Sequence, residues 1–123
     1  MEGSGIARTT LFLYGTLKRG EKSHRLMAGQ RFVGAAATEP RYRLHDLGPY
    51  PGLVADAAGV AVAGELWEVD AAGLAELDRF EGVPDLFIRE PVAVQGAAGP
   101  VEAYLYARPI PPGARCGSSW PLG

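Results

Sequence analysis

The sequence predicts one strand-dominated α+β domain whose strands form a small barrel. Six or seven short segments have strand-like apolar patterns, and one substantial segment has an apolar repeat at helical spacing. A chain of 123 residues is long enough for a single core. Because few residues remain to cover two open sheet faces, a barrel is the economical arrangement of so many short strands.

The first predicted strand, residues 10–14, is almost wholly apolar, as strands buried on both faces are. It leads into the turn Tyr14-Gly15-Thr16-Leu17. Gly15 permits close backbone approach, and Tyr14 and Thr16 supply hydroxyls. Such a turn directs N–H groups toward one point and can form a concave site for a small carboxylate. The alternative is an ordinary buried strand that ends in a glycine turn.

The remaining elements follow from periodicity and turn residues. A short helix over residues 24–27 is expected after the cap Ser23, with Gly29 ending it. The main helix begins after the cap Asp70, repeats Leu74, Leu77 and Phe80, and ends at Gly82. Further strands are expected at residues 31–38, 42–47, 53–55, 60–69, 86–94 and 101–106.

The ordered domain is expected to span residues 9–108. Residues 1–8 are predicted to be a loose leader. Residues 109–123 contain four prolines and no apolar periodicity, so they are predicted to form a tail on the surface or without order.

Glu81 is the candidate catalytic residue. It lies in the last turn of the predicted helix, directly before Gly82, where the helix dipole disfavours an ionised carboxylate by up to about 1 kcal/mol. Apolar neighbours add a desolvation cost of the same sign. Both effects raise the pKa toward neutrality, where one carboxyl can take and give a proton. The alternative is a solvated glutamate at a helix end.

Three tyrosines are further candidates for a binding pocket. Tyr50 lies between two prolines, so it is held on a rigid loop and either lines a pocket or packs on the core. Tyr104 and Tyr106 share one face of the last strand, where a phenol could reach a ligand or simply pack.

Composition excludes several function classes. The net charge is −2 and the basic residues do not cluster, so neither nucleic acid nor an anionic membrane is an expected partner. Cys116 is the only cysteine, which rules out an internal disulfide. The N-terminus lacks the pattern of a secretory signal, and cytoplasmic localisation is expected. His24 and His45 are not spaced as metal ligands, and no nucleotide-binding motif occurs, so no metal or cofactor is expected.

Residues 10–107 contain an ordered series of motifs: Tyr14-Gly15-Thr16-Leu17-Lys18-Arg19-Gly20, His24 followed by Leu26, Pro49-Tyr50-Pro51, Gly64-Glu65-Leu66, Leu77-Asp78-Arg79-Phe80-Glu81-Gly82, Arg89 and Tyr104-Leu105-Tyr106. This series resembles the gamma-glutamylcyclotransferase-like family, in the branch of gamma-glutamylamine cyclotransferase and the plant AIG2-type proteins. One departure is Phe87, where many relatives place a tyrosine before Arg89.

The resemblance implies a small mixed β-barrel with flanking helices and a small-molecule gamma-glutamyl substrate. Residues 14–17 would hold the α-carboxylate and α-amine of the gamma-glutamyl group, Glu81 would be the acid and base, and Tyr50 and Tyr106 would line the pocket. The implied reaction is attack of the substrate's own α-amine on its γ-carbonyl, which releases 5-oxoproline and an amine. It needs no cofactor. The chain is expected to be a monomer or a homodimer.

The sequence also permits a non-catalytic binding module. A non-catalytic relative could keep the turn at residues 14–17 and bind gamma-glutamyl or amino-acid-like metabolites. Glu81 favours the enzyme, because a cavity that only binds an amino acid gains little from a carboxyl with a raised pKa.

Overall fold

The structure is a computed structural model that describes residues 7–122. The leader expected at residues 1–8 therefore lies almost wholly outside the described residues. The described residues contain one α-helix, α1 (Ala71–Phe80), and one 3-10 helix, η2 (His24–Met27). The strands are β1 (Arg8–Leu13), β2 (Arg31–Ala37), β3 (Tyr42–Asp46), β4 (Pro51–Ala55), β5 (Ala63–Asp70), β6 (Phe87–Pro91), β7 (Glu102–Tyr106) and β8 (Cys116–Gly117).

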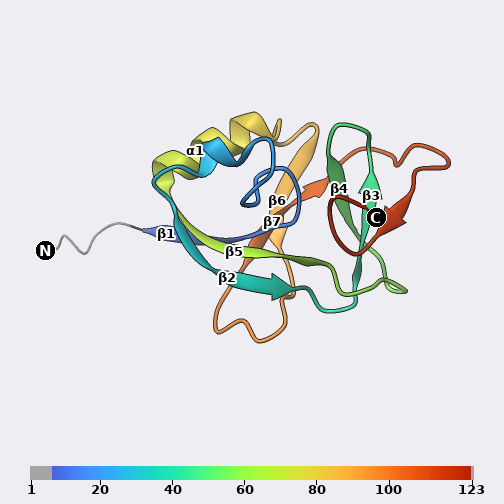
Figure 1. The fold of residues 1–123 in the computed structure, drawn as a ribbon, viewed down its shortest axis with the longest axis horizontal. Coiled ribbons are helices and arrows are strands. Elements are labelled where there is room, and N and C mark those ends of the chain that lie inside the picture. Colours follow the sequence, from blue (N-terminus) through green and yellow to red (C-terminus); the bar gives the residue numbers. More distant parts are fainter. Residues whose placement is uncertain (1–6, 123) are drawn as a thin grey trace, which may run out of the picture.

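The strands form one curled, mixed sheet, a half-barrel (Figure 1), which confirms the predicted fold class. Its order is β2-β5-β1-β7-β4-β3-β8, and β6 pairs with β7 outside this path. The central strand β1 is antiparallel to β5 and parallel to β7. Both α1 and η2 lie on the same side of the molecule, next to β1 (Figure 1). The loop after β1 therefore begins close to the helices.

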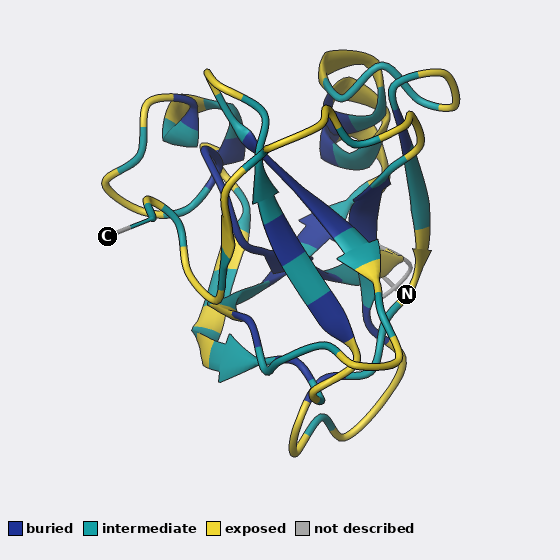
Figure 2. Cartoon of the chain, turned by 90° about the vertical axis from the view of Figure 1, so that its right-hand side faces the viewer, coloured by how far each residue is buried: buried dark blue, intermediate teal, exposed yellow. Residues whose placement is uncertain are grey.

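Alternation along β1 divides the core into two clusters. Phe12 and Tyr14 pack inside the half-barrel, whereas Leu11 and Leu13 pack on the side that α1 and η2 cover. Strand β7 alternates in the same way, with Ala103 inside the half-barrel. This explains why β1 reads as a continuous apolar run: both of its faces are buried. Figure 2 shows the buried residues concentrated on the strands that cross the middle of the molecule.

Several boundaries differ from the sequence-based expectation. Strand β5 begins at residue 63 instead of residue 60, because the Val62 N–H donates to the Thr38 hydroxyl (2.9 Å) and not to a neighbouring strand. Strand β6 ends at Pro91, three residues earlier than expected. The expected Ser23 side-chain cap does not form: residues 24–27 are a 3-10 helix, and the Ser23 side chain makes no capping hydrogen bond.

The C-terminal segment takes part in the fold. Strand β8 pairs with β3, and Trp120 and Leu122 pack against the cluster inside the half-barrel. Cys116 is exposed and forms no disulfide. Across residues 7–122, the helices are too short or too polar to cross a membrane.

Two strand glycines provide a test of the register between β1, β2 and β5. A Cβ on Gly64 would lie 2.4 Å from the Leu13 carbonyl oxygen, while a Cβ on Gly34 would meet nothing within 4 Å. We expect Gly64→Ala to lower the free energy of unfolding by about 1–3 kcal/mol, the usual cost of overpacking. Gly34→Ala should change it by less than about 0.5 kcal/mol. Urea denaturation of both variants checks this, and equal stability would contradict the register.

Candidate active site

A cavity of about 330 Å³ opens between the loop after β1, the end of α1 and the start of β6. This volume is at the low end of the range for small-molecule sites, about 300–1,000 Å³. Its lining combines polar groups of the loop after β1, and Glu81, with apolar and aromatic side chains from four other segments. The lining residues are Leu13, Tyr14, Gly15, Thr16, Leu17, Lys22, Ser23, Tyr50, Pro51, Phe80, Glu81, Leu86, Phe87 and Tyr104.

The structure brings together all but one of the residues that the sequence indicates. Residues 14–17, Tyr50 and Glu81 line the same cavity although they are far apart along the chain. Tyr106 is the exception. Its ring lies against Phe87, 5.4 Å between centroids, and Tyr104, two residues earlier on the same face of β7, lines the cavity in its place.

The turn at residues 14–17 leaves unused hydrogen-bond donors. Among residues 7–122, the backbone N–H groups of Gly15, Thr16 and Leu17 donate to no carbonyl in a turn or loop. The Lys18 N–H donates to the Gly15 carbonyl (3.2 Å), and the Ser23 N–H donates to the Thr16 carbonyl (2.9 Å), so the turn is closed on itself. Buried donors without partners are rare in proteins. Successive donors of this kind are the groups that bind anions in other proteins.

The side chains of this turn differ from the expectation in two ways. The Tyr14 hydroxyl does not serve the cavity: it donates to the Tyr104 carbonyl (2.5 Å) and accepts from the Leu53 N–H (3.3 Å). Burial, with the charge of Glu81 adding to it, raises the pKa of Tyr14, so the phenol stays neutral and joins β7 to β4. Gly15 is required by the protein itself, since a Cβ there would lie 2.8 Å from Pro51 Cγ.

Glu81 is placed by the way α1 ends. It is the C-cap, and its N–H donates to the Leu77 carbonyl (2.8 Å). Gly82 follows with φ 69°, and the N–H groups of Gly82 and Val83 donate to the carbonyls of Arg79 and Asp78. This Schellman arrangement needs a left-handed residue after the cap, which explains the glycine.

The Glu81 carboxylate makes no hydrogen bond or ion pair with any residue in the range 7–122. Burial raises its pKa from 4.5 to about 7. The sequence predicts that burial and the helix dipole both raise this pKa, and in the structure burial is the cause. A carboxyl with this pKa exchanges protons readily near neutral pH.

Asp78, one turn earlier on α1, has the opposite environment. Arg89 donates two hydrogen bonds to it (3.0 Å each), and the Tyr104 hydroxyl donates a third (2.7 Å). The hydrogen bonds from Arg89 are the main reason that the pKa of Asp78 is lowered. Burial, with Asp78 adding to it, raises the pKa of Tyr104. Arg89 thus keeps Asp78 ionised and paired. Of these two carboxyl groups at the end of α1, Glu81 is the one that can exchange a proton near neutral pH.

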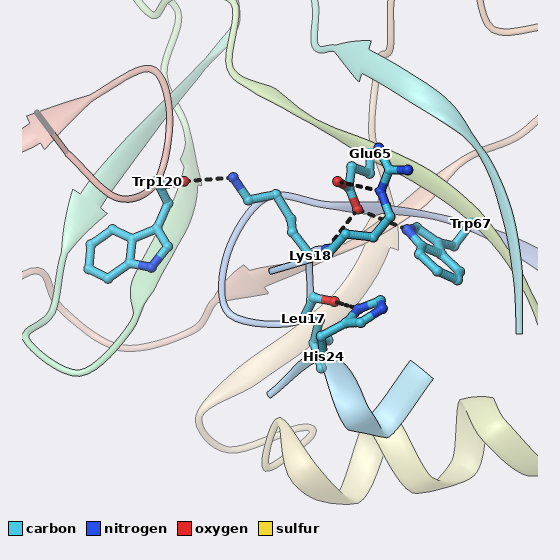
Figure 3. Close-up of polar contacts among 7 residues, drawn as sticks. Leu17, Lys18, His24, Glu65, Trp67 and Trp120 are labelled. Carbon is cyan, nitrogen blue, oxygen red and sulfur yellow. Dashed lines mark hydrogen bonds and ion pairs between the residues drawn. The ribbon is translucent and has the colours of Figure 1, made fainter. Parts of the chain in front are cut away.

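The loop after β1 is held by hydrogen bonds to three other parts of the chain (Figure 3). Glu65 accepts from the Arg19 N–H (3.1 Å), from Arg19 Nε (3.3 Å) and from Trp67 Nε1 (3.1 Å). His24 Nδ1 hydrogen-bonds with the Leu17 carbonyl (2.9 Å). Lys18 Nζ donates to the Trp120 carbonyl (2.6 Å). These contacts come from β5, from η2 and from the C-terminal segment, so three separate parts of the fold fix the turn.

Sequence reasoning missed several residues of the cavity. Lys22, Ser23, Phe80, Leu86 and Phe87 line it, yet no short motif assigns them a role there. Phe87 was singled out only for its difference from relatives. The other four can be recognised only from the three-dimensional structure, because each lies at or next to the end of a helix or strand that reaches the cavity. Among the described residues no three His, Cys, Asp or Glu side chains gather in a way that could hold a metal ion.

Comparisons with known proteins agree with this geometry. Residues 11–120 match the family model "Gamma-glutamyl cyclotransferase, AIG2-like". The chain is 38% identical to the gamma-glutamylaminecyclotransferase of Bos taurus over 78% of this chain and 63% of that protein. It is 36% identical to the Rattus norvegicus protein of the same name, over 79% of this chain and 76% of that one.

A crystal structure gives the same result. An AIG2-like protein from Mus musculus superposes with a TM-score of 0.84 and 29% identity, over 92% of this chain and 88% of that one. The fold and the matched length define an AIG2-like protein. The chain belongs to the gamma-glutamyl cyclotransferase family, AIG2-like.

The contacts of Glu65 generate a testable prediction about the turn. In Glu65→Ala the backbone N–H of Arg19 loses its charged hydrogen-bond acceptor. A hydrogen bond to a charged group contributes about 1.5–3 kcal/mol, so hydrogen exchange at the Arg19 amide should become at least roughly tenfold faster. The matched control is Glu68→Ala, on the same strand, which removes the exposed ion pair with Arg31. It should leave exchange at Arg19 unchanged. If Glu65→Ala also leaves that amide as protected as before, Glu65 does not hold the turn.

Proposed function

We propose that the protein cyclises gamma-glutamyl amides and releases 5-oxoproline and a free amine, with Glu81 as the acid and base. The observation that carries the proposal is the presence, in one cavity, of a partly buried carboxyl without a hydrogen-bond partner and three unused N–H groups. Membership of the cyclotransferase family and the names of the bovine and rat relatives support it.

The three N–H groups at residues 15–17 suit the α-carboxylate of the gamma-glutamyl group. A carboxylate bound there accepts hydrogen bonds from N–H groups that otherwise have no acceptor. The hydroxyls of Thr16 and Ser23 lie in the same lining and can bind the neighbouring amine. This end of the substrate is thereby fixed, and its α-amine is held within reach of its own γ-carbonyl.

The reaction balances with a single carboxyl. Ionised Glu81 takes a proton from the substrate's α-ammonium, and the free amine nitrogen attacks the γ-carbonyl carbon. A new C–N bond closes the five-membered lactam as the bond to the leaving amine breaks. Protonated Glu81 gives its proton to the leaving nitrogen. The ring nitrogen loses its second proton as the lactam forms, and this proton passes by way of Glu81 to the released amine, which leaves as its ammonium ion. The nucleophile belongs to the substrate, so no serine or cysteine nucleophile is needed.

Measuring 5-oxoproline release from a panel of gamma-glutamyl amides tests the function, and Glu81→Gln tests the assignment. This variant keeps the shape of the side chain but cannot carry a proton, so turnover should fall by at least roughly 10²-fold. In the wild type, kcat/KM should rise with pH as Glu81 ionises at about pH 7. Glu76→Gln, at an exposed position on α1, is the control and should keep full activity.

Retention of near-normal turnover in Glu81→Gln would overturn the assignment of the acid and base. A protein that binds gamma-glutamyl amides equally well with and without Glu81, and turns over none of them, would instead be a binding module.

A further inference from the structure

Away from the turn at residues 14–17, the cavity is lined by apolar and aromatic side chains. Tyr50 and Phe87 pack ring against ring, 5.9 Å between centroids, and Leu86 and Pro51 adjoin them. Phe80, also in the lining, is 47% exposed. Together with Leu86 and Phe87, it gives this part of the cavity the apolar lining against which small-molecule sites bury apolar ligand groups.

Charge is scarce in this part of the cavity. Among the lining residues that the structure describes, only Lys22 and Glu81 have charged side chains. Two carboxylates close to the lining are paired with arginines: Asp78 with Arg89, and Glu65 with Arg19. Within the lining, a second positive charge on the leaving amine would therefore meet no carboxylate apart from Glu81, and Lys22 would repel it.

We propose that the leaving group of the substrate is an amine on an uncharged alkyl or aryl chain, bound against Phe80, Leu86 and Phe87. This inference rests on the proposed cyclotransferase function, because it assigns the half of the substrate that the turn at residues 14–17 does not hold. Burial of each methylene or ring carbon against these side chains favours such a chain over one that ends in an ammonium.

Two substrates of equal size separate the alternatives. In gamma-glutamyl-n-hexylamide the chain ends in a methyl group, and in the mono-gamma-glutamyl amide of 1,5-diaminopentane an ammonium occupies the same position. We expect kcat/KM for 5-oxoproline release to be at least roughly tenfold higher for the hexylamide, the scale on which apolar sites discriminate.

A variant pair locates the preference. Phe80→Glu places a carboxylate at the exposed edge of the cavity, and should lower the ratio of the two kcat/KM values at least roughly tenfold by favouring the ammonium. Val33→Glu introduces the same charge at the other strongly exposed apolar position, on β2, outside this lining. It should leave the ratio unchanged.

The outcomes distinguish this inference from the function on which it rests. If neither substrate, nor any other gamma-glutamyl amide, yields 5-oxoproline, the proposed function fails and this inference fails with it. If 5-oxoproline is released but the diaminopentane amide is used as well as or better than the hexylamide, only the apolar leaving group is overturned. A ratio that Phe80→Glu does not change would place the leaving group elsewhere in the cavity.

Discussion

The partial burial of one unpaired carboxyl group, that of Glu81, is the constraint around which the rest of the site is arranged. Taking a carboxylate out of water without a partner is costly, and the group responds by holding its proton at higher pH. A fold keeps such a residue only if its backbone is fixed firmly enough that the side chain cannot turn to solvent. The Schellman arrangement at Gly82 and Val83 supplies that fixation.

The contrast with Asp78 shows how one helix end supports two different carboxyls. Arg89 and Tyr104 satisfy Asp78 and keep it ionised, and Arg89 also donates to Glu102 on β7 (2.5 Å). This network ties α1 to β6 and β7 and so sets the position of the helix relative to the sheet. Glu81 is next to the network but outside it. Pairing Glu81 in the same way would hold its pKa low and remove its capacity to exchange protons near pH 7.

The turn at residues 14–17 is held by the fold in a comparable manner. Inside the half-barrel, the Tyr14 hydroxyl joins the backbones of β7 and β4. Outside the cavity, Glu65, His24 and the Trp120 carbonyl hold the residues that follow (Figure 3). Because the protein's own contacts order the turn, its N–H groups are already in place before a ligand arrives, which lowers the entropic cost of binding.

Local sequence patterns were sufficient to predict most of the elements, and they pointed to residues 14–17 and Glu81, which the structure brings to one cavity. The continuous apolar run of β1 and the capped repeat of α1 predicted both elements to within a few residues, and the fold class was confirmed. What local patterns could not predict is what depends on three-dimensional packing. The choice of Tyr104 over Tyr106 depends on where β7 passes α1, since both lie on one face. The role of the Tyr14 hydroxyl depends on a strand partner ninety residues away. Phe80 and Leu86 belong to the cavity only because α1 and β6 meet there.

The central claim, that burial tunes Glu81 for proton exchange, is tested most directly by NMR titration of its side-chain carboxyl. The Glu81 resonance is assigned by its absence from the spectrum of Glu81→Gln, and its chemical shift is followed from pH 4 to pH 9. The structure predicts a midpoint at about 7. A midpoint near the ordinary value of 4.5 would show a solvated carboxylate and contradict the account.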